Sequence, residues 1–357
     1  MHNFNIEDVV KEIVELDGGS MLKAQVRLDS LTKPQGSLGR LEELAKQISG
    51  ITGSLNPDMS SKLIIVMAAD HGVVDEGVSA YPKEVTPQMV YNFLNGGAGI
   101  NVLSNHVGAD VVIVDAGVAA DLTALNSNSS FINKKIAFGT GNMAKGPAMS
   151  VEQARQALEI GIDVARQMIE RGYGIIGTGD MGIGNTTASS AIASCMCGVD
   201  AEFVTGYGTG IDQEGFTRKV DVIRRVIEVN KPERRDGFEV LAKIGGFEIG
   251  GIAGVILGCA ARRVPVVIDG FISGAGALIA ESIAPKCRDY MIASHCSVEK
   301  GHKIMLEKLG MKPLFNFDMR LGEGTGAALG ISIAQASMKI LNEMATFGEA
   351  GVSQKNE

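Results

Sequence analysis

The sequence predicts a mostly parallel, doubly wound α/β fold. Apolar runs of strand length alternate along the chain with helical patterns, which is typical of strand–helix–strand units. The run at residues 63–69 is continuously apolar, as expected of a strand that is covered on both faces. Most of these runs end in Asp, Gly or His, and parallel strands bring such endings to one edge of the sheet. Because ligands bind at that edge in open α/β sheets, we expect it to be the working face.

The chain is expected to begin with helices, up to about residue 55. Apolar residues recur there at helical spacing, and a second helix is expected from Leu41 onward. The loop between the two helices, residues 31–40, carries the cations Lys33 and Arg40. These could meet an anion or a partner subunit, although solvated loop charges are the commoner arrangement.

Five or six strands are expected. The clear candidates are residues 63–69, 111–114, 174–176, 264–268 and 290–293, and residues 135–138 are a weaker one. Asp70, Asp115 and Asp269 follow three of these runs. They could belong to the working face, but such aspartates more often cap the following helices or brace loops.

Helical stretches separate the strands. Ser150 and Gln153 form a capping box at the start of one helix, and Gly172 supplies its stop. The most apolar run, residues 249–261, is too short to span a bilayer and is rich in glycine. We expect it to be a buried helix.

Residues 173–187 carry the strongest local signal for a ligand site. A short strand is expected to end at a glycine cluster, and a helix of small residues follows from Asn185, Thr186 and Thr187, which are good N-cap residues. Glycines let the backbone approach a ligand, and the N–H groups at a helix start favour an anion, most simply a phosphate. The stretch therefore predicts a phosphate-binding turn.

Two well-known nucleotide-binding motifs fit this stretch less well. A Walker loop is excluded, because no Gly-Lys-Ser/Thr follows the glycines. Gly177, Gly179 and Gly182 fit G-x-G-x-x-G, but a dinucleotide site also needs an acidic residue after a second strand about 20 residues further on. Asp200 has nearly that spacing, yet it follows a pattern typical of a helix end. A purely structural turn remains an alternative.

Composition narrows the class of protein. The 357 residues are 45% hydrophobic and 21% charged, with a net charge of −8, which argues against nucleic acid or an anionic membrane as the main partner. Five cysteines without C-x-x-C, and no signal peptide at the start, favour reduced thiols in a cytoplasmic protein. The five histidines lack ligand spacing, so no metal site is predicted.

Six segments, in order over nearly the whole chain, resemble the nicotinate-nucleotide–dimethylbenzimidazole phosphoribosyltransferase family. They are LTKPQGSLGRLE at 31–42, ADHGV at 69–73, GVSAYP at 77–82, GIGNTT at 182–187, SHCS at 294–297 and LGEGTG at 321–326. The resemblance implies transfer of the phosphoribosyl group of nicotinate mononucleotide to 5,6-dimethylbenzimidazole or a related base. The products would be α-ribazole 5′-phosphate and nicotinate, in the synthesis of the lower ligand of cobalamin.

The resemblance also implies an architecture. By this resemblance we expect a Rossmann-like sheet domain and a small helical domain built from both chain termini, assembled as a homodimer. In this sequence the small domain would comprise residues 1–55 plus 325–350, and the large nucleotide- and base-binding domain residues 56–324. The implied partners are small-molecule substrates, with no cofactor.

Two acids are the expected catalytic residues. Glu323, between Gly322 and Gly324, matches the family's catalytic glutamate by resemblance. As one benzimidazole nitrogen attacks C1′, the opposite N–H becomes acidic, and a carboxylate within hydrogen-bond reach can orient the ring and accept that proton. A partly apolar pocket would raise the pKa of Glu323 toward the working pH. The structural alternative is a helix N-cap carboxylate ahead of residues 325–340.

Asp180 is the second acid. It lies directly before Met-Gly-Ile-Gly-Asn, where the family usually has glutamate. Its shorter side chain favours positioning of the ribose or the loop over service as an alternative base.

The resemblance and the glycine stretch together give two groups of expected binding residues. Those expected at the nucleotide and its phosphate are Gly182, Gly184, Asn185, Thr186, Thr187, Gly208, Lys219 and Ser297. Lys219 could otherwise be a solvated helix charge. A flat, largely apolar base calls for an apolar pocket with few polar groups, and the matching residues are Ser79, Tyr81, Gln88, Met181 and Leu321.

Two other functions compete with the phosphoribosyl transfer. An NAD-dependent oxidoreductase would use the G-x-G-x-x-G, but the ribose-binding acid is missing. A nucleotide- or base-binding regulatory protein that has lost turnover is the second, and Glu323 speaks against it.

Overall fold

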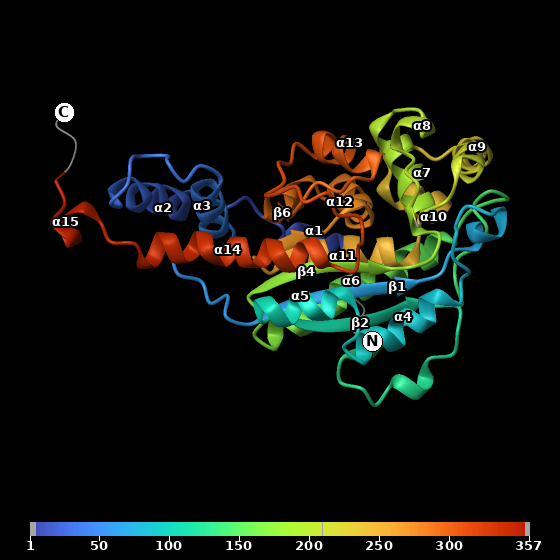
Figure 1. The fold of residues 1–357 in the computed structure, drawn as a ribbon, viewed down its shortest axis with the longest axis horizontal. Coiled ribbons are helices and arrows are strands. Elements are labelled where there is room, and N and C mark those ends of the chain that lie inside the picture. The colour runs from blue at the N-terminus through green and yellow to red at the C-terminus, as the bar shows by residue number, and fades with distance from the viewer. Residues whose placement is uncertain (1–4, 209, 354–357) are drawn as a thin grey trace.

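Six parallel strands form one sheet (Figure 1). The computed structural model describes residues 5–208 and 210–353. The strands are β1 (Lys62–Ala69), β2 (Asp110–Gly117), β3 (Phe131–Asn133), β4 (Ile175–Met181), β5 (Val266–Ile268) and β6 (Met291–Ala293). Their order is β3-β2-β1-β4-β5-β6, and every neighbouring pair is parallel. This order reverses between β1 and β4, so the predicted doubly wound, Rossmann-like fold is confirmed.

The weaker strand prediction, residues 135–138, is wrong. β3 ends at Asn133, although the N–H groups of Lys134 and Ile136 still donate to the carbonyls of Asp115 and Ala116 in β2 at 2.9 and 3.0 Å. Lys135 Nζ lies 2.8 Å from the Asp115 carboxylate. Asp115 is fully buried, and a buried carboxylate without a cationic partner is strongly destabilising. Lys135 therefore serves as an ion-pair partner and is not part of a strand.

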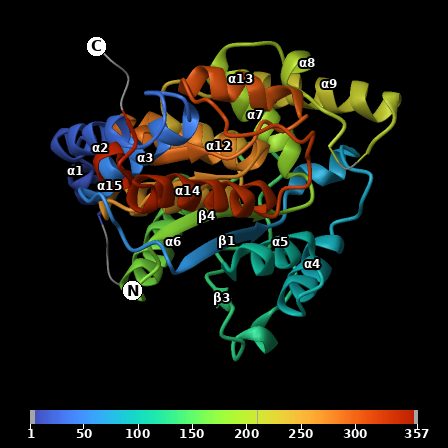
Figure 2. The ribbon, with the colours of Figure 1, turned by 60° about the vertical axis from the view of Figure 1, so that its left-hand side comes forward.

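Alternate side chains of β1 enter two apolar cores, one on each face of the sheet. Leu63 and Met67 pack in the core of α6 (Val151–Glu170) and α11 (Phe247–Ala261). Ile64 and Ala68 pack in the core of α4 (Val85–Leu94), α5 (Gly99–Val107) and α14 (Thr325–Glu343). Figure 2 shows α4 and α5 across β1 and β4 from α7 (Asn185–Cys197), α12 (Phe271–Ile283) and α13 (Lys300–Leu309). The sheet is thus covered on both faces, as its continuous apolar runs predict.

The remaining elements are short connections and further helices. They are η1 (Gly72–Glu76), α8 (Ala201–Val204), α9 (Gln213–Asn230), α10 (Gly237–Ile244), η2 (Thr123–Leu125) and η3 (Pro285–Tyr290).

The capping signals predicted for α6 are confirmed. The Gln153 N–H donates to Ser150 Oγ at 3.1 Å, and the Ser150 N–H donates to Gln153 Oε1 at 3.0 Å. The helix ends at Glu170, and Gly172 follows with a φ of +96°. Glycine adopts this left-handed conformation without steric cost, so the stop is local in origin.

The buried helix expected at residues 249–261 is α11, and its glycines bring it against α6. A Cβ at Gly254 would lie 2.1 Å from the Leu158 carbonyl oxygen, and one at Gly161 would lie 2.0 Å from the Gly251 carbonyl oxygen. The two helices therefore touch backbone to backbone. Across the described residues, 5–208 and 210–353, no helix is both long and apolar enough to cross a membrane.

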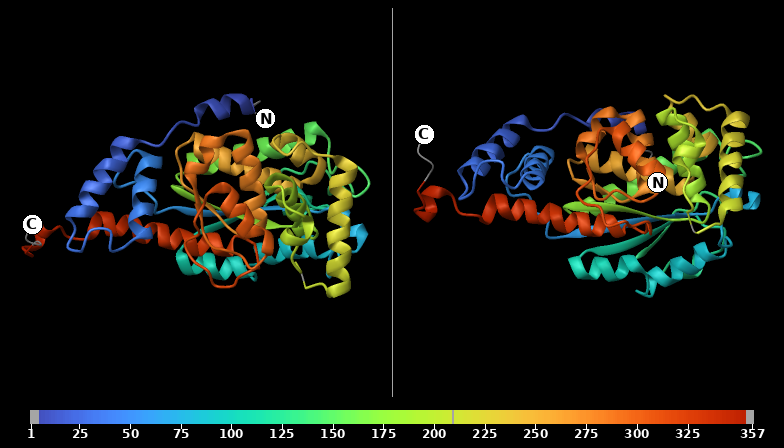
Figure 3. Two further views of the ribbon diagram at one scale, coloured as in Figure 1. Left: turned by 90° about the horizontal axis from the view of Figure 1, so that it is seen from above. Right: turned by 45° about the horizontal axis from the view of Figure 1, so that its top comes forward.

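Figure 3 shows α2 (Gly18–Ser30) and α3 (Arg40–Thr52) beside the end of α14 and α15 (Phe347–Ala350), at one end of the molecule. Helices precede the sheet, as predicted, but α1 (Ile6–Glu12) packs its Ile6 and Val9 in the core of α6 and α11. Arg27 Nε donates to the Leu341 carbonyl at 2.6 Å, and Leu31 pairs with Thr346 in an antiparallel bridge. The division into a small domain (residues 1–55 plus 325–350) and a large one (56–324) stays a prediction.

Lys33 is not a solvated loop charge. Its Nζ lies 2.8 Å from Glu42 Oε1, and both side chains are buried. Glu42 also accepts the Leu38 N–H at 2.9 Å, so this ion pair folds the loop at residues 31–40 over the start of α3. Arg40 is half-buried and is paired with Glu43 at 2.9 Å.

Candidate active site

The first two glycines of the G-x-G-x-x-G pattern lie inside β4, which continues through Met181 instead of ending at Ile176. A Cβ at Gly179 would lie 2.5 Å from the Glu323 carbonyl oxygen, and one at Gly177 would lie 3.0 Å from Ala327 Cβ. These glycines therefore let the start of α14 approach the sheet. A dinucleotide fingerprint would need them in the turn, so that alternative loses its basis.

Gly182 and Gly184 form the turn between β4 and α7. α7 begins at Asn185 as predicted, but its N-cap is Gly184, with a φ of +97°, and no side chain caps it. The Ile183 N–H donates to Thr86 Oγ1 at 3.1 Å, which fixes the turn to the first turn of α4. The first N–H groups of α7 are thus left without a side-chain cap, as an anion site requires.

Lys219 lies over this helix start. It projects from α9, is 1% exposed, and its Nζ donates to Thr186 Oγ1 at 2.8 Å. A Cβ at Gly208 would lie 3.0 Å from both of these atoms, so the bare Gly208 backbone covers them. Burial lowers the pKa of Lys219 to about 8. An ammonium has three donors, and this one is in contact with a single neutral hydroxyl in the described structure, so it favours an anionic ligand. The alternative of a solvated helix charge is wrong.

Asp180 closes β4 beneath the turn. Its carboxylate is buried, and Oδ2 accepts from Asn185 Nδ2 at 3.0 Å. Burial, and then the neighbouring Asp269, raises the pKa of Asp180 well above its usual range. A Cβ at Gly322 would lie 3.2 Å from Asp180 Oδ2, so Asp180 lies between the glycine turn and the Gly322–Gly324 segment.

Glu323 lies on that second segment, with a φ of +62°. Its side chain is buried, and Oε2 accepts the Ile100 N–H in the first turn of α5 at 3.1 Å. The N-cap of α14 is Gly324, so Glu323 does not cap its own helix and that structural alternative is wrong. Burial raises the pKa of Glu323, and the bond from Ile100 partly offsets that rise.

Asp269 fixes the backbone beside Glu323, a role that its position after a strand does not predict. It follows β5, and its oxygens accept the N–H groups of Gly324, Gly326 and Ala327 at 3.2, 2.7 and 3.1 Å. Burial raises the pKa of Asp269 to about 7. The strand-end aspartates do brace loops, which is their commoner role, but Asp269 also holds the start of α14, a helix far along the chain.

Asp70 and Asp115 also brace loops. Asp70 Oδ2 accepts the Ala119 N–H at 2.7 Å, and Asp115 Oδ1 accepts the Val118 N–H at 2.9 Å. Both acceptors therefore hold the segment after β2, and neither caps the helix that follows its own strand.

Three further contacts tie the site together. Arg320 Nη1 donates to the Gly208 carbonyl at 2.8 Å and so joins the Glu323 segment to the Lys219 side. The Ser297 N–H donates to His302 Nδ1 at 2.9 Å, and Ser297 Oγ accepts the Glu299 N–H at 3.3 Å. Glu299 contributes to the field that sets the pKa of Lys219, so Ser297 is linked to that side of the site through Glu299.

The residues expected at the base lie on more open surface. Tyr81 is 53% exposed, and its N–H and carbonyl both bond Ser79 Oγ. Gln88 is exposed on α4, two residues after Thr86, and Met181 is half-buried at the end of β4. Leu321 is 59% exposed, and its Cδ2 lies 2.8 Å from where a Cβ of Gly99 would be. Leu321 is therefore next to Glu323, whereas Ser79 and Tyr81 bond each other in the loop that precedes α4.

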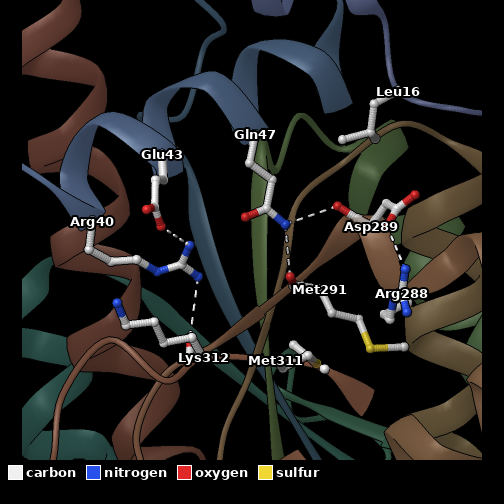
Figure 4. Close-up of a pocket in the computed structure, with 10 residues that line it drawn as sticks. Leu16, Arg40, Glu43, Gln47, Arg288, Asp289, Met291, Met311 and Lys312 are labelled. Atoms are coloured by element: carbon white, nitrogen blue, oxygen red, sulfur yellow. Dashed lines mark hydrogen bonds and ion pairs between the residues drawn. The ribbon is translucent and has the colours of Figure 1, made fainter. Parts of the chain in front are cut away.

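A cavity of about 370 Å³ opens elsewhere, between α3 and the segment that leads into β6 (Figure 4). Gln47 Nε2 bridges it by donating to the carbonyls of Asp289 and Met291 at 2.9 and 3.0 Å. Two arginines line this cavity: Arg40 is paired with Glu43, and Arg288 lies 3.7 Å from Asp289. This cavity opens at the amino end of β6, whereas the acids and Lys219 lie beyond the carboxyl ends of the strands.

The described part of the chain contains no group of three or more His, Cys, Asp or Glu residues that is arranged to hold a metal ion. The fold and the site define a class: an α/β enzyme in which a helix start without a side-chain cap faces buried carboxyl groups at the carboxyl edge of a parallel sheet.

Comparison with known proteins places the chain within this class. The sequence model of a family described as phosphoribosyltransferase matches residues 13–352, and the chain belongs to this family. It is 57% identical over 352 residues to the nicotinate-nucleotide–dimethylbenzimidazole phosphoribosyltransferase of Roseiflexus sp. strain RS-1, with 99% of each chain covered. The protein of the same name from Geobacter metallireducens is 54% identical over 349 residues, covering 98% of each chain.

A solved structure supports the same assignment. The crystal structure of the nicotinate-nucleotide–dimethylbenzimidazole phosphoribosyltransferase from Thermus thermophilus superimposes with a TM-score of 0.89 at 43% sequence identity. The match covers 95% of this chain and 100% of that chain.

Proposed function

We propose that this enzyme transfers the phosphoribosyl group of nicotinate mononucleotide to 5,6-dimethylbenzimidazole or a related base. The products are α-ribazole 5′-phosphate and nicotinate, and the reaction belongs to the synthesis of the lower ligand of cobalamin. The observation that carries the proposal is the opposition of a buried lysine at a helix start and a buried glutamate, with Asp180 between them. The names of the full-length relatives support the choice of substrates.

The reaction needs few catalytic groups. A nitrogen of the base attacks C1′ while the bond from C1′ to the pyridinium nitrogen breaks, and nicotinate leaves with the electron pair of that bond. Because the leaving group departs from a positively charged ring, it requires no proton. The attacking ring becomes cationic, and its other N–H must lose a proton.

Glu323 is the group that accepts this proton. One of its oxygens is occupied by the Ile100 N–H, which leaves Oε1 for the base. Burial raises its pKa, so it is a stronger base than an exposed glutamate, and the bond from Ile100 favours the ionised form that can accept the proton.

The phosphate is held by the turn and helix start after β4. The N–H groups of Gly184 and Thr186 provide neutral donors, and Lys219 provides the charge. The N–H groups of Asn185 and Thr187 donate to the carbonyls of Gly182 and Gly184 at 3.1 and 3.0 Å and so hold the turn in shape. The buried Thr187 hydroxyl has no partner within the described residues and is a further donor. Gly208 allows close approach, and Ser297 contacts the nucleotide from the α13 side.

Asp180 positions the ribose in its protonated form. Its raised pKa makes it a poor carboxylate base, and a neutral carboxyl can donate a hydrogen bond to a ribose oxygen. Oδ1 of this buried group has no partner within the described residues and is the atom assigned to the ribose.

The base lies between Glu323 and the surface formed by Ser79, Tyr81, Gln88, Met181 and Leu321. The apolar side chains of Met181 and Leu321 contact its ring faces and edges, and Tyr81 contributes an exposed aromatic ring. The openness of this half of the site in a single chain supports a homodimer, in which a second copy covers the base.

The free thiols of Cys195, Cys197, Cys259, Cys287 and Cys296 support a reducing, cytoplasmic setting.

A product assay tests the function. Nicotinate mononucleotide is incubated with a panel of benzimidazoles, purines and phenols, and the products are identified by mass spectrometry and by comparison with an authentic α-glycoside. The expected result is an α-N-linked ribazole 5′-phosphate and one equivalent of nicotinate. Failure to release nicotinate with any base of the panel would reject the proposed function.

A further inference from the structure

Two residues at the start of α5 contact the groups assigned to the acceptor base. Ile100 is fully buried, and its N–H donates to Glu323 Oε2. The residue at the N-cap, Ala98, has no polar side chain and cannot accept from the first turn. The Glu323 carboxylate therefore satisfies an N–H that the helix itself leaves without a partner. It also lies at the positive end of the α5 dipole, which favours its ionised form.

Gly99 contacts the same carboxylate from the preceding position. A Cβ there would lie 2.8 Å from Leu321 Cδ2 and 3.4 Å from Glu323 Oε2. Gly99 has no positive φ, so the backbone conformation does not require glycine. A side chain at position 99 would enter the space between Leu321 and Glu323. Leu321 is largely exposed, so its tip can swing away from an added methyl group without disturbing the core.

We propose that the first turn of α5 is a positioning and specificity element for the acceptor base, an inference that rests on the proposed function. The Ile100 N–H orients Glu323 and keeps it ionised, so that Oε1 faces the ring N–H. The absence of a side chain at Gly99 lets Leu321 lie close to α5 and sets the width of the slot for a flat heterocycle.

The first experiment compares Gly99→Ala with the wild type. The added methyl group displaces Leu321 into the slot, and KM for 5,6-dimethylbenzimidazole is expected to rise about 10-fold, the size expected for one methyl group in a pocket. KM for nicotinate mononucleotide stays within about twofold, since its site lies across the gap. Thermal stability is not expected to fall, because alanine is favoured over glycine in a helix.

A double variant separates displacement of Leu321 from general damage. In the double variant Gly99→Ala with Leu321→Ala, the truncated side chain at position 321 is too short to be displaced into the slot. The KM for the base is therefore expected to equal that of Leu321→Ala alone, a non-additive result. Additive effects of the two substitutions, or equal increases in both KM values, would overturn the assignment of Gly99.

The second experiment tests the Ile100 N–H. Ile100→Pro removes this donor at a position in the first helical turn, where proline is tolerated. Removing a bond to the charged form raises the pKa of Glu323, so the acid limb of the pH profile of kcat/KM moves to higher pH. Ile100→Val trims the same buried side chain and keeps the N–H, so its acid limb stays at the wild-type pH.

These results distinguish the two proposals. A wild-type enzyme that forms no ribazole phosphate would refute the proposed function itself. An active wild type in which Ile100→Pro and Ile100→Val have the same acid limb would refute only the role assigned to α5.

Discussion

We expect two buried residues of opposite charge, Lys219 and Glu323, to set the pH dependence of the proposed reaction. Burial lowers the pKa of Lys219 to about 8, and burial raises the pKa of Glu323 above its usual value. In the proposed mechanism both groups are needed in the charged form, the lysine to bind phosphate and the glutamate to accept a proton. We therefore expect activity between an acid limit and an alkaline limit of pH, which approach each other because both side chains are buried.

Replacing Glu323 by glutamine tests the proton acceptor. Glutamine has a similar shape but cannot take up a proton, so kcat is expected to fall by about 10²- to 10⁴-fold, the usual contribution of a general base. Isothermal titration with nicotinate mononucleotide serves as the control, because its affinity does not depend on this proton. A rate within a factor of about five of the wild type would contradict the assigned role.

Replacing Lys219 tests the phosphate site. Lys219→Met removes the charge, and KM for nicotinate mononucleotide is expected to rise about 10- to 100-fold, in line with the loss of a charge-assisted hydrogen bond. In the wild type, kcat/KM for this substrate is expected to fall as the pH rises through about 8, because the free lysine loses its proton there.

The matched variant is Lys219→Arg. Arginine stays protonated at every accessible pH, so the alkaline limb should disappear or move well above pH 8, whatever the absolute rate. An alkaline limb that stays in place in this variant would assign it to another group.

At the scale of elements, glycines decide which helices can touch. α6 and α11 approach each other through their backbones because Gly161, Gly251 and Gly254 have no side chains. β4 and the start of α14 approach closely because of Gly177 and Gly179. The second contact has a consequence for function, because it places Glu323 directly beside Asp180. Gly177 and Gly179, which match a ligand-binding fingerprint in the sequence, are therefore packing residues that affect the site only through the segment that they bring close.

Gly254→Ala tests the contact between α6 and α11. Its Cβ would lie 2.1 Å from the Leu158 carbonyl oxygen, and the backbone cannot rotate away as a side chain can. We expect a loss of about 1–3 kcal/mol or more in the free energy of unfolding, as for other overpacked cores, measured by urea denaturation.

Gly348→Ala in α15 is the control for this variant. Nothing lies within 4 Å of where its Cβ would be, so the free energy of unfolding should change by less than about 1 kcal/mol. Equal stabilities of the two variants would show that α6 and α11 are not in backbone contact.

At the scale of the whole molecule, the parallel sheet gathers acids that are far apart in sequence. Asp70 follows β1, Asp180 closes β4, Asp269 follows β5, and Glu323 precedes α14. Burial raises the pKa of all four. Each therefore binds protons more tightly in the folded protein than in the unfolded chain, and each favours folding below its folded pKa.

This cluster predicts that stability falls as the pH rises. Asp269 has a raised pKa of about 7 against an ordinary value of 3.8, so its contribution is complete below pH 3.8 and is lost as the pH rises through about 7. The melting temperature of the wild type is expected to decline between pH 5 and pH 8. Differential scanning calorimetry over this range, at constant ionic strength, measures the decline.

Asp269→Asn isolates one member of the cluster. Asparagine does not titrate, so the decline from pH 5 to pH 8 should be shallower than in the wild type, although the variant is less stable overall because an acceptor for the α14 N–H groups is lost. A slope that does not change would mean that Asp269 contributes nothing to this pH dependence.

Local signals predicted the elements well where the signal lies within a few residues. The capping box at Ser150 and the apolar run at 63–69 form as expected, because each depends on neighbours in the chain. α7 also begins at Asn185 as expected, but its N-cap is Gly184 and no side chain caps it. The edge strand forms at Phe131–Asn133 and not at 135–138, and Lys135 pairs with the buried Asp115 carboxylate, a contact that strand propensity does not predict. The ion pair of Lys33 with Glu42 was missed for the same reason.

By itself the sequence determined the class of fold, the family, and the residue types at the site, because strand runs, helix caps and family motifs are each encoded within a short segment. Only the tertiary structure decided which of these residues meet. Asp269 holding the turn of Glu323, Ile100 donating to its carboxylate, and Arg320 bonding Gly208 join positions more than 50 residues apart. Such contacts depend on the parallel sheet bringing strand ends to one edge and on glycines letting α14 reach it, and neither is visible in any one segment.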